Sequence, residues 1–328
     1  MTLFTPPPAA LPHVLVLGGT GFVGRALCEH LQRAGVARIT VPTRRLRQAQ
    51  GLRHLPAVVP VQADVHDSAT LARLLPGVDA VVNLVAILHG SAAAFDHVHR
   101  ALPEKLAAAC VQAGVRQLVH VSALGVGPQA PSLYLQSKTA GEAVLQQAAQ
   151  QHSLALGLLR PSVIFGAQDR FLNLFAGLQA LAPLMPLAGQ SARFQPVWVE
   201  DVAAGLLALL QHPQATAGRV FEATGPEVFT LGELVHLAGR WAGHDRPQLP
   251  LPHWAGWLQA AALEWAPGGP LMSRDNLRSM QVPNVASGSL PGLPALGVDP
   301  AALQAVAPAY LAAGQGCARL DGWRASHR

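Results

Sequence analysis

The chain contains little cysteine, lysine or tyrosine. Its 328 residues include only three cysteines, Cys28, Cys110 and Cys317, which stand far apart and form no CxxC or Cys/His pattern. This spacing excludes a disulfide framework and a zinc-type centre, so we expect no bound metal. A reducing cytoplasmic location fits this use of cysteine.

Basic runs and uninterrupted apolar segments are also missing. Lysine supplies two of the 23 basic residues and arginine the other 21, but no basic run with interleaved aromatics occurs, which argues against nucleic acid as a partner. The most apolar long window, residues 171–189, is interrupted by polar residues and prolines, so no transmembrane helix is expected. Residues 1–11 lack the basic and apolar regions of a signal peptide, and their prolines predict a disordered lead-in. We therefore expect a cytoplasmic protein, with peripheral attachment at the inner face of the membrane as the alternative.

Strand-like apolar runs alternate with helix-like segments along most of the chain. The predicted strands are residues 13–17, 38–43, 57–63, 79–87, 117–122, 155–160 and 219–223, and the helices among them are 22–34, 68–75, 92–113 and 134–151. This alternation predicts an α/β fold, a doubly wound parallel sheet of Rossmann type. We expect the nucleotide domain to span residues 12–224, with 166–193 reaching into a second lobe, and a smaller C-terminal lobe to span 225–328.

A glycine-rich turn follows the first predicted strand. In LVLGGTGFVGRAL, residues 15–27, Gly18 permits a tight turn, Gly21 permits close approach of a pyrophosphate, and Gly24 lets the helix pack on the strand. A purely structural turn is the alternative, but the position after the first strand favours dinucleotide binding. The residues assigned to the cofactor here are Gly18, Thr20, Gly21, Phe22, Val23 and Gly24.

The end of the second predicted strand distinguishes the two dinucleotides. Thr43, Arg44 and Arg45 stand where an acidic residue would bind the ribose 2′-hydroxyl of NAD, and no Asp or Glu occurs from His30 to Ala63. Arginines suit a 2′-phosphate, so NADP(H) is favoured over NAD(H), with a solvated basic loop as the alternative.

Two neighbouring residues follow the third predicted strand. Both are assigned to the cofactor, and Asp64 is the kind of residue that meets the adenine edge; the other is Val65. The Asp64 side chain could instead cap the helix that follows, and both interpretations remain open at this point.

One of the two tyrosines and one of the two lysines stand four residues apart at the start of a predicted helix. Tyr134 and Lys138 share a helix face, where an ammonium would lower the tyrosine pKa toward a useful range for acid–base chemistry. Ser122, at the end of the preceding strand, can hold a substrate oxygen while Tyr134 transfers a proton and a nicotinamide transfers a hydride. The alternative is a packed Tyr134 ring beside a solvated Lys138.

Several motifs together resemble a known family. GGTGFVG, NLVAIL, HVSALG, YLQSK and LRPSVIFG resemble short-chain dehydrogenases/reductases of extended or atypical type, the NAD-dependent epimerase/dehydratase group. SALG, RPSVIFGAQDRFLN, RFQPVWVEDVA and PLMSRDNLRSMQV are similar to bacterial relatives of the nucleotide-binding accessory subunit of respiratory complex I. The likeness covers nearly the whole chain beyond residue 12.

The resemblance implies a Rossmann fold and roles for particular residues. Ser122, Tyr134 and Lys138 would be catalytic, and Lys138 would also hold the ribose hydroxyls. Further cofactor contacts would come from Asn83, Val85, Ala86, Pro161 and Val163. Lys105 stands where many relatives carry an asparagine that supports a proton relay, a departure that bears on turnover.

Two main functions are consistent with these motifs. The first is an NADP(H)-dependent oxidoreductase or epimerase acting on a small-molecule substrate. The second is a nucleotide-stabilised accessory or assembly factor of a membrane-associated respiratory complex, without turnover; a sensor of the NADP(H) ratio is a lesser alternative. The apolar stripe that contains Trp254, Trp257 and Trp265 is typical of a helix packed on its own core, or else forms a docking face.

Overall fold

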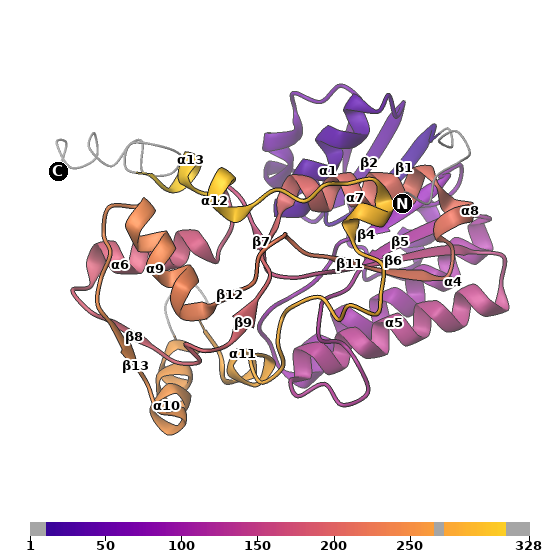
Figure 1. The fold of residues 1–328 in the computed structure, drawn as a ribbon. Coiled ribbons are helices and arrows are strands. Elements are labelled where there is room, and N and C mark those ends of the chain that lie inside the picture. Colours follow the sequence, from indigo (N-terminus) through magenta and orange to yellow (C-terminus); the bar gives the residue numbers. More distant parts are fainter. Residues whose placement is uncertain (1–10, 266–271, 313–328) are drawn as a thin grey trace. The chain divides into compact units, whose positions relative to one another are not determined.

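The structure, a computed structural model, describes residues 11–265 and 272–312 (Figure 1). The predicted lead-in through residue 10 and Cys317 lie outside the described residues. The chain divides into two compact units whose segments interleave: unit 1 holds Met1–Pro161, Val199–Ala223 and Ser287–Asp299, and unit 2 holds Ser162–Trp198, Thr224–Ala286 and Pro300–Arg328. The domain boundaries drawn from the sequence stay a prediction.

A parallel sheet of seven strands forms the centre of unit 1, in the order β11-β6-β5-β4-β1-β2-β3. Its central strands are apolar along their length, because a sheet covered on both faces leaves no polar side; the side chains of β1 from Val14 to Leu17 are fully buried. The predicted fold class is confirmed. The strands are β1 (His13–Leu17), β2 (Arg38–Thr43), β3 (Val58–Gln62), β4 (Ala80–Asn83), β5 (Gln117–Val121), β6 (Ala155–Pro161) and β11 (Arg219–Ala223).

Helices cover both faces of this sheet. In Figure 1, α1 and α7 lie together on one face and α4 and α5 on the other. Helix α2 also packs against α4. The predicted helix 92–113 consists of α3, a π-helical segment η2 and α4, and it ends at Gly114, whose φ of 69° favours glycine. The helical elements of unit 1 are α1 (Phe22–Arg33), η1 (Leu46–Leu52), α2 (Ser68–Leu74), α3 (Ala92–Asp96), η2 (His97–Ala101), α4 (Leu102–Ala113), α5 (Leu133–Gln151), α7 (Val199–Gln211), α8 (Pro213–Thr216) and η3 (Leu293–Leu296).

The segment Ser287–Asp299 returns to unit 1 and lies along β11. The backbone N–H of Glu222 donates to the carbonyl oxygen of Pro291 at 2.9 Å, and the Glu222 carboxylate accepts from the N–H of Ser287 at 2.8 Å. Further on, Leu293 packs so closely on α7 that a Cβ at Gly205 would come 2.8 Å from its side chain. A late part of the chain thereby completes unit 1.

Unit 2 combines short strand pairs with helices around its own core. Asp169 organises one end: its carboxylate accepts from the N–H groups of Phe171 and Leu172 at 2.8 and 2.7 Å and from the Tyr310 hydroxyl at 2.9 Å, which fixes the start of α6. The strands are β7 (Ile164–Phe165), β8 (Met185–Leu187), β9 (Arg193–Phe194), β10 (Val197–Trp198), β12 (Phe229–Thr230) and β13 (Gln248–Pro250). The helices are α6 (Leu172–Leu181), α9 (Leu231–Trp241), α10 (His253–Leu263), α11 (Arg274–Ser279), α12 (Leu303–Val306) and α13 (Pro308–Leu311).

Helix α10 exposes its large side chains and buries its small ones. Trp254 is 69% exposed and Trp265, just beyond the helix, 88%, whereas the buried positions are Gly256 and Ala260. A Cβ at Gly256 would come 2.6 Å from that of Ala188, so only glycine allows this close approach. The expectation that the tryptophan stripe packs on its own core is therefore wrong.

Candidate active site at the carboxyl edge of the sheet

Most of the predicted site residues lie at one edge of the sheet in unit 1. Because neighbouring strands are parallel, their carboxyl ends meet at that edge, where α/β folds bind ligands. The residues at or just after the strand ends are Gly18 for β1, Thr43 to Arg45 for β2, Asp64 and Val65 for β3, Asn83, Val85 and Ala86 for β4, Ser122 for β5 and Pro161 for β6. Val163 belongs to unit 2, where its N–H donates to Asn284 Oδ1 at 3.0 Å.

The turn between β1 and α1 leaves no room for side chains. Gly18 has a φ of 81°, and a Cβ there would come 3.1 Å from the Leu84 backbone. A Cβ at Gly24 would overlap the Gly18 carbonyl oxygen, so the helix meets the strand only if this residue is glycine. Gly19, which was not predicted from the sequence, is equally constrained, because its Cβ would lie 2.8 Å from Val41.

The start of α1 can receive an anion. Its N-cap is Gly21, no described side chain caps it, and its first turn carries no acidic residue. The N–H groups at the start of a helix have no partners within the helix, and they attract phosphate. The turn with Thr20, Phe22 and Val23 therefore fits a pyrophosphate.

Two exposed arginines follow β2. Thr43 is buried, and its hydroxyl donates to the Arg45 carbonyl oxygen at 3.2 Å, which holds the loop in place. Arg44 and Arg45 are exposed and form no ion pair among the described residues. Their guanidinium groups are available to an anionic ligand at the carboxyl end of β2.

The N-terminus of α2, the helix after β3, is capped by Asp67 and not by Asp64. Asp67 accepts from the N–H groups of Ala69 and Thr70 at 3.4 and 2.9 Å, so the capping role considered for Asp64 is wrong. Asp64 instead accepts from the His66 N–H at 3.1 Å and is exposed. Its carboxylate therefore remains accessible at the strand end.

Ser122, Tyr134 and Lys138 come from β5 and α5. Ser132 begins α5 by accepting from the Leu135 N–H, which sets Tyr134 in the first turn. Lys138 is 1% exposed, and its Nζ donates to the Val121 carbonyl oxygen at 2.6 Å, beside Ser122. Ser122 is 3% exposed, and its Oγ has no hydrogen-bond partner among the described residues. A buried hydroxyl without a partner is suited to bind a substrate oxygen.

The pKa of Tyr134 is shifted in the direction opposite to the predicted one. Burial raises it to about 12, because the phenolate would lose its hydration. Burial also lowers the pKa of Lys138 to about 8, partly opposed by the Glu142 carboxylate. The expected lowering of the tyrosine pKa by the ammonium is therefore wrong for this structure: Lys138 directs its Nζ to the Val121 carbonyl.

His99, not Lys105, lies against Tyr134. The two rings meet edge to face with centroids 5.5 Å apart, and His99 Nδ1 lies 2.8 Å from Ser137 Oγ, which donates to the Tyr134 carbonyl oxygen. Lys105 Nζ donates instead to the His66 carbonyl oxygen at 2.9 Å. His99, and not Lys105, is therefore the side chain in contact with the Tyr134 ring.

A glycine brings α5 close to His99. A Cβ at Gly141 would overlap the His99 carbonyl oxygen, so this residue sets the separation between α5 and η2. Pro103 has no N–H to offer that same carbonyl four residues earlier, which accounts for the π-helical turn at this point.

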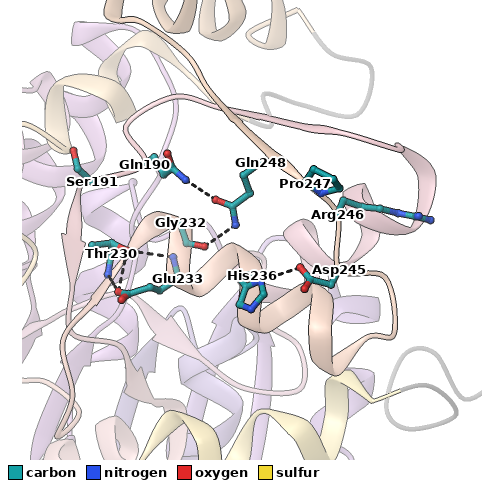
Figure 2. A pocket seen from close by; sticks show the side chains of 10 residues that line it. All are labelled: Gln190, Ser191, Thr230, Gly232, Glu233, His236, Asp245, Arg246, Pro247 and Gln248. Atoms are coloured by element: carbon teal, nitrogen blue, oxygen red, sulfur yellow. Dashed lines mark hydrogen bonds and ion pairs between the residues drawn. The ribbon is translucent and has the colours of Figure 1, made fainter.

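A pocket in unit 2 is a second candidate ligand site. Figure 2 shows its polar side chains turned toward one another: Gln190 donates to Gln248 at 2.9 Å, and His236 Nδ1 lies 2.9 Å from Asp245. Thr230 and Glu233 satisfy each other in a capping box at the start of α9. These side chains already have partners, so we assign no ligand to this pocket.

The part of the chain that the structure describes contains neither a cluster of metal ligands nor a helix that could cross a membrane. No group of three or more His, Cys, Asp or Glu side chains could hold a metal ion among residues 11–265 and 272–312. In the same residues, no helix is both long and apolar enough to cross a membrane.

Comparison with known proteins gives a matching family and several relatives. Residues 14–224 match the model of the NAD dependent epimerase/dehydratase family. Subunit 9 of the mitochondrial NADH dehydrogenase [ubiquinone] 1 alpha subcomplex of Mus musculus is 30% identical over 300 residues, 88% of this chain and 77% of that one. The match to the same subunit of Dictyostelium discoideum covers 68% of this chain but only 62% of that protein, at 30% identity.

An enzyme and a solved structure are also similar. A ceramide reductase of Caulobacter vibrioides is 32% identical over 202 residues, 61% of each chain. The crystal structure of a dTDP-glucose 4,6-dehydratase from Streptomyces venezuelae, with NAD and TYD bound, superposes with a TM-score of 0.63 at 23% identity, covering 73% of this chain and 85% of that one. From the family match over most of unit 1, with the glycine turn and the parallel sheet that it requires, the chain belongs to the NAD dependent epimerase/dehydratase family.

Proposed function

We propose that this protein is an NADP(H)-dependent oxidoreductase that reduces a carbonyl group. The observation that carries the proposal is the buried Ser122 hydroxyl, which has no partner among the described residues and lies beside the carbonyl that holds Lys138. The glycine turn and the open start of α1 would hold the pyrophosphate. When bound, the dinucleotide supplies the hydride.

Four side chains of the candidate site would perform the other parts of the reaction. Ser122 Oγ donates a hydrogen bond to the substrate oxygen and holds it in place. Tyr134 donates its hydroxyl proton to the same oxygen as negative charge develops there. Lys138, whose Nζ is held beside Ser122 by the Val121 carbonyl oxygen, would bind the ribose hydroxyls of the nucleotide. His99, neutral and bonded to both Ser137 and the loop after β4, keeps the tyrosine ring in place.

The raised pKa of Tyr134 fits the proton-donating role that reduction requires. At about 12 it keeps the hydroxyl protonated at neutral pH, which suits a group that donates a proton. We therefore assign Tyr134 as a general acid.

Single-turnover kinetics test this function. The protein loaded with NADPH is mixed with a panel of ketones and aldehydes, long-chain and sugar-linked compounds among them, and the loss of nicotinamide absorbance is followed. Oxidation of the bound nucleotide by one class of carbonyl is the expected result. If none of the compounds oxidises it, the proposal is wrong.

We infer that Arg44 and Arg45 select NADP(H) through its 2′-phosphate. Replacing both by serine removes charge-assisted hydrogen bonds of about 1.5–3 kcal/mol each, so NADPH affinity should fall by at least ~100-fold. NADH has no 2′-phosphate, and its affinity should not change. Fluorescence titration with both nucleotides measures this, with the exposed Arg47→Ser as the matched control. An equal loss of affinity for NADH would show that the two arginines do not bind the 2′-phosphate.

A second role is supported by the exposed face of α10. We infer that Trp254, Trp257 and Trp265 dock onto a protein subunit of a respiratory NADH dehydrogenase, as the relatives' names suggest. Tryptophan and arginine dominate the energetics of protein interfaces, and Arg274 stacks 4.9 Å from the Trp257 ring centre.

Co-purification tests the docking face. Affinity-tagged protein from its own host should carry subunits of the NADH dehydrogenase, and the double variant Trp254→Ser/Trp257→Ser should lose them, because two interface tryptophans contribute at least ~2 kcal/mol each. Leu46→Ser, another exposed apolar residue, is the control and should retain them. Retention of the subunits by the tryptophan variant would contradict docking through α10.

A further inference from the structure

Lys105, on α4, is bonded to the loop that follows β3. Its Nζ donates to the His66 carbonyl oxygen at 2.9 Å, across a separation of 39 residues in the chain. The side chain is partly buried, and a backbone carbonyl is a strong acceptor for the amine. The proposed reaction of Ser122 and Tyr134 leaves this contact without a role.

Three contacts of His66 fix the turn after β3. Its N–H donates to Asp64 Oδ1 at 3.1 Å, and its carbonyl oxygen accepts from Lys105. Its ring stacks on that of His97, with the centroids 4.4 Å apart and the planes inclined by 19°. His97 lies on η2 and Lys105 on α4, which follow each other directly. The turn 64–66 is therefore attached to one continuous helical stretch.

The residues on either side of His66 are anchored as well. Val65 packs against the core cluster that contains Leu106, the residue after Lys105. Asp67 begins α2 by accepting from two N–H groups of its first turn. Between these anchors the Asp64 carboxylate is exposed at the carboxyl end of β3. It is an acceptor, and the exocyclic amine of adenine is a donor.

A turn that is already ordered binds a base more tightly than one that the ligand must order. Ordering a loop on binding costs affinity, and a preformed loop avoids that cost. Without the Lys105 amine, the His66 carbonyl would lose its donor and the turn would lose one of its attachments to α4. The cost would fall on the part of the ligand that meets Asp64.

We propose that Lys105 is a positioning residue for the adenine half of the dinucleotide: its amine holds the His66 carbonyl oxygen and thereby keeps the Asp64 carboxylate in place for the base. The assignment of Asp64 to adenine rests on the proposed function, in which the protein binds NADP(H). The contacts that hold the turn do not rest on it.

Replacing Lys105 by methionine removes the amine and keeps an unbranched side chain of similar length. NADPH and NADH both carry adenine, so the affinity for each should fall about 10-fold, as expected for the loss of one hydrogen bond from a charged donor. Reduced nicotinamide mononucleotide has no adenine, and its affinity should stay at the wild-type value. Fluorescence titration with the three nucleotides measures these affinities.

Arg100→Met is the matched control for the loss of a positive charge. Arg100 is exposed on η2 and pairs with Asp96 at 3.4 Å, so its removal takes a cation from the same helical stretch and leaves the Lys105 contact in place. Its affinities for NADH and NADPH should match the wild type. The proposal is overturned by an unchanged NADH affinity in Lys105→Met, by an equal loss for the mononucleotide, or by an equal loss in Arg100→Met.

The wild-type protein provides a test that does not depend on the folding of a variant. The chain has two lysines, so isotope-labelled lysine gives two side-chain NMR signals. Adenosine monophosphate, which carries the adenine, should shift the Lys105 signal. Reduced nicotinamide mononucleotide should shift the signal of Lys138, which is held beside Ser122. A Lys105 signal that adenosine monophosphate does not shift overturns the proposal.

Failure of this proposal and failure of the reductase function give different results. A carbonyl panel without reaction, together with a Lys105 signal that adenosine monophosphate shifts, would remove the reductase function and leave the role of Lys105 intact. Reduction of a carbonyl together with an unshifted Lys105 signal would remove the role of Lys105 and leave the reductase function intact.

Discussion

Replacing Tyr134 by phenylalanine is expected to slow single-turnover reduction by about 10³-fold. The variant keeps the ring that packs against His99 but has no hydroxyl proton to give, and general acid catalysis contributes about 10²–10⁴-fold. Nucleotide affinity should be unchanged, because the ring and the helix remain in place. Rapid-mixing kinetics with NADPH and the carbonyl found by the panel measure the loss.

The second tyrosine provides the matched control. Tyr310→Phe removes the same atom in unit 2, where the hydroxyl bonds to Asp169, and should cost about 1 kcal/mol of stability without slowing the reaction. A Tyr134→Phe variant that reacts at the wild-type rate would show that this tyrosine is not the acid. The fold assignment would stand in that case, and the accessory role would become the better account.

Unit 1 should lose stability steeply on mild acidification because two buried histidines resist protonation. Burial, with the Lys138 charge as a second cause, lowers the pKa of His99 to about 3, and burial lowers that of His120 well below its ordinary value. In the unfolded chain both titrate near about 6.5. Below that pH the unfolded state binds two protons that the folded state does not bind, so the free energy of unfolding falls as pH falls.

The slope of this loss identifies the residues. Each proton contributes about 1.4 kcal/mol per pH unit, so the pair gives a slope of about 3 kcal/mol per pH unit between about pH 6 and pH 4. His99→Gln and His120→Asn should each reduce the slope by one proton, whatever they do to the stability at pH 7. Urea unfolding at several pH values measures it, with the exposed His54→Asn as control. A slope unaltered by both variants would contradict the assignment.

The strands of the sheet were predicted closely from the sequence, because the composition and the flanking residues of each strand are local signals. The runs 13–17, 38–43 and 219–223 coincide with β1, β2 and β11, since each contains strand-forming Val, Ile, Phe or Thr residues and is bounded by glycine, proline or charge. Residues 79–87 were predicted as one strand, but β4 ends at Asn83. There the chain turns, and the side chain of Asn83 bonds to the Val85 N–H, a contact that apolar composition does not reveal.

The supporting residues of the site could not be predicted in the same way. Whether His99 or Lys105 meets Tyr134 depends on how η2 crosses α5, and that crossing is set by Gly141, more than 30 residues further along the chain. A signal was nevertheless present. His99 continues the buried stripe Phe95, Leu102 and Leu106 at helical spacing, and His120 interrupts the apolar strand QLVHV two residues before Ser122.

The late segment Ser287–Asp299 has a consequence for association between molecules. Outer strands of a sheet expose hydrogen-bonding groups that can recruit another chain and start aggregation. On one outer strand, β3, Pro60 has no N–H to offer; on the other, β11, the Glu222 N–H is already taken by Pro291. A fragment ending at residue 286 would contain all seven strands and still leave β11 open to intermolecular pairing. The segment Ser287–Asp299 thus prevents β11 from pairing with a strand of another molecule.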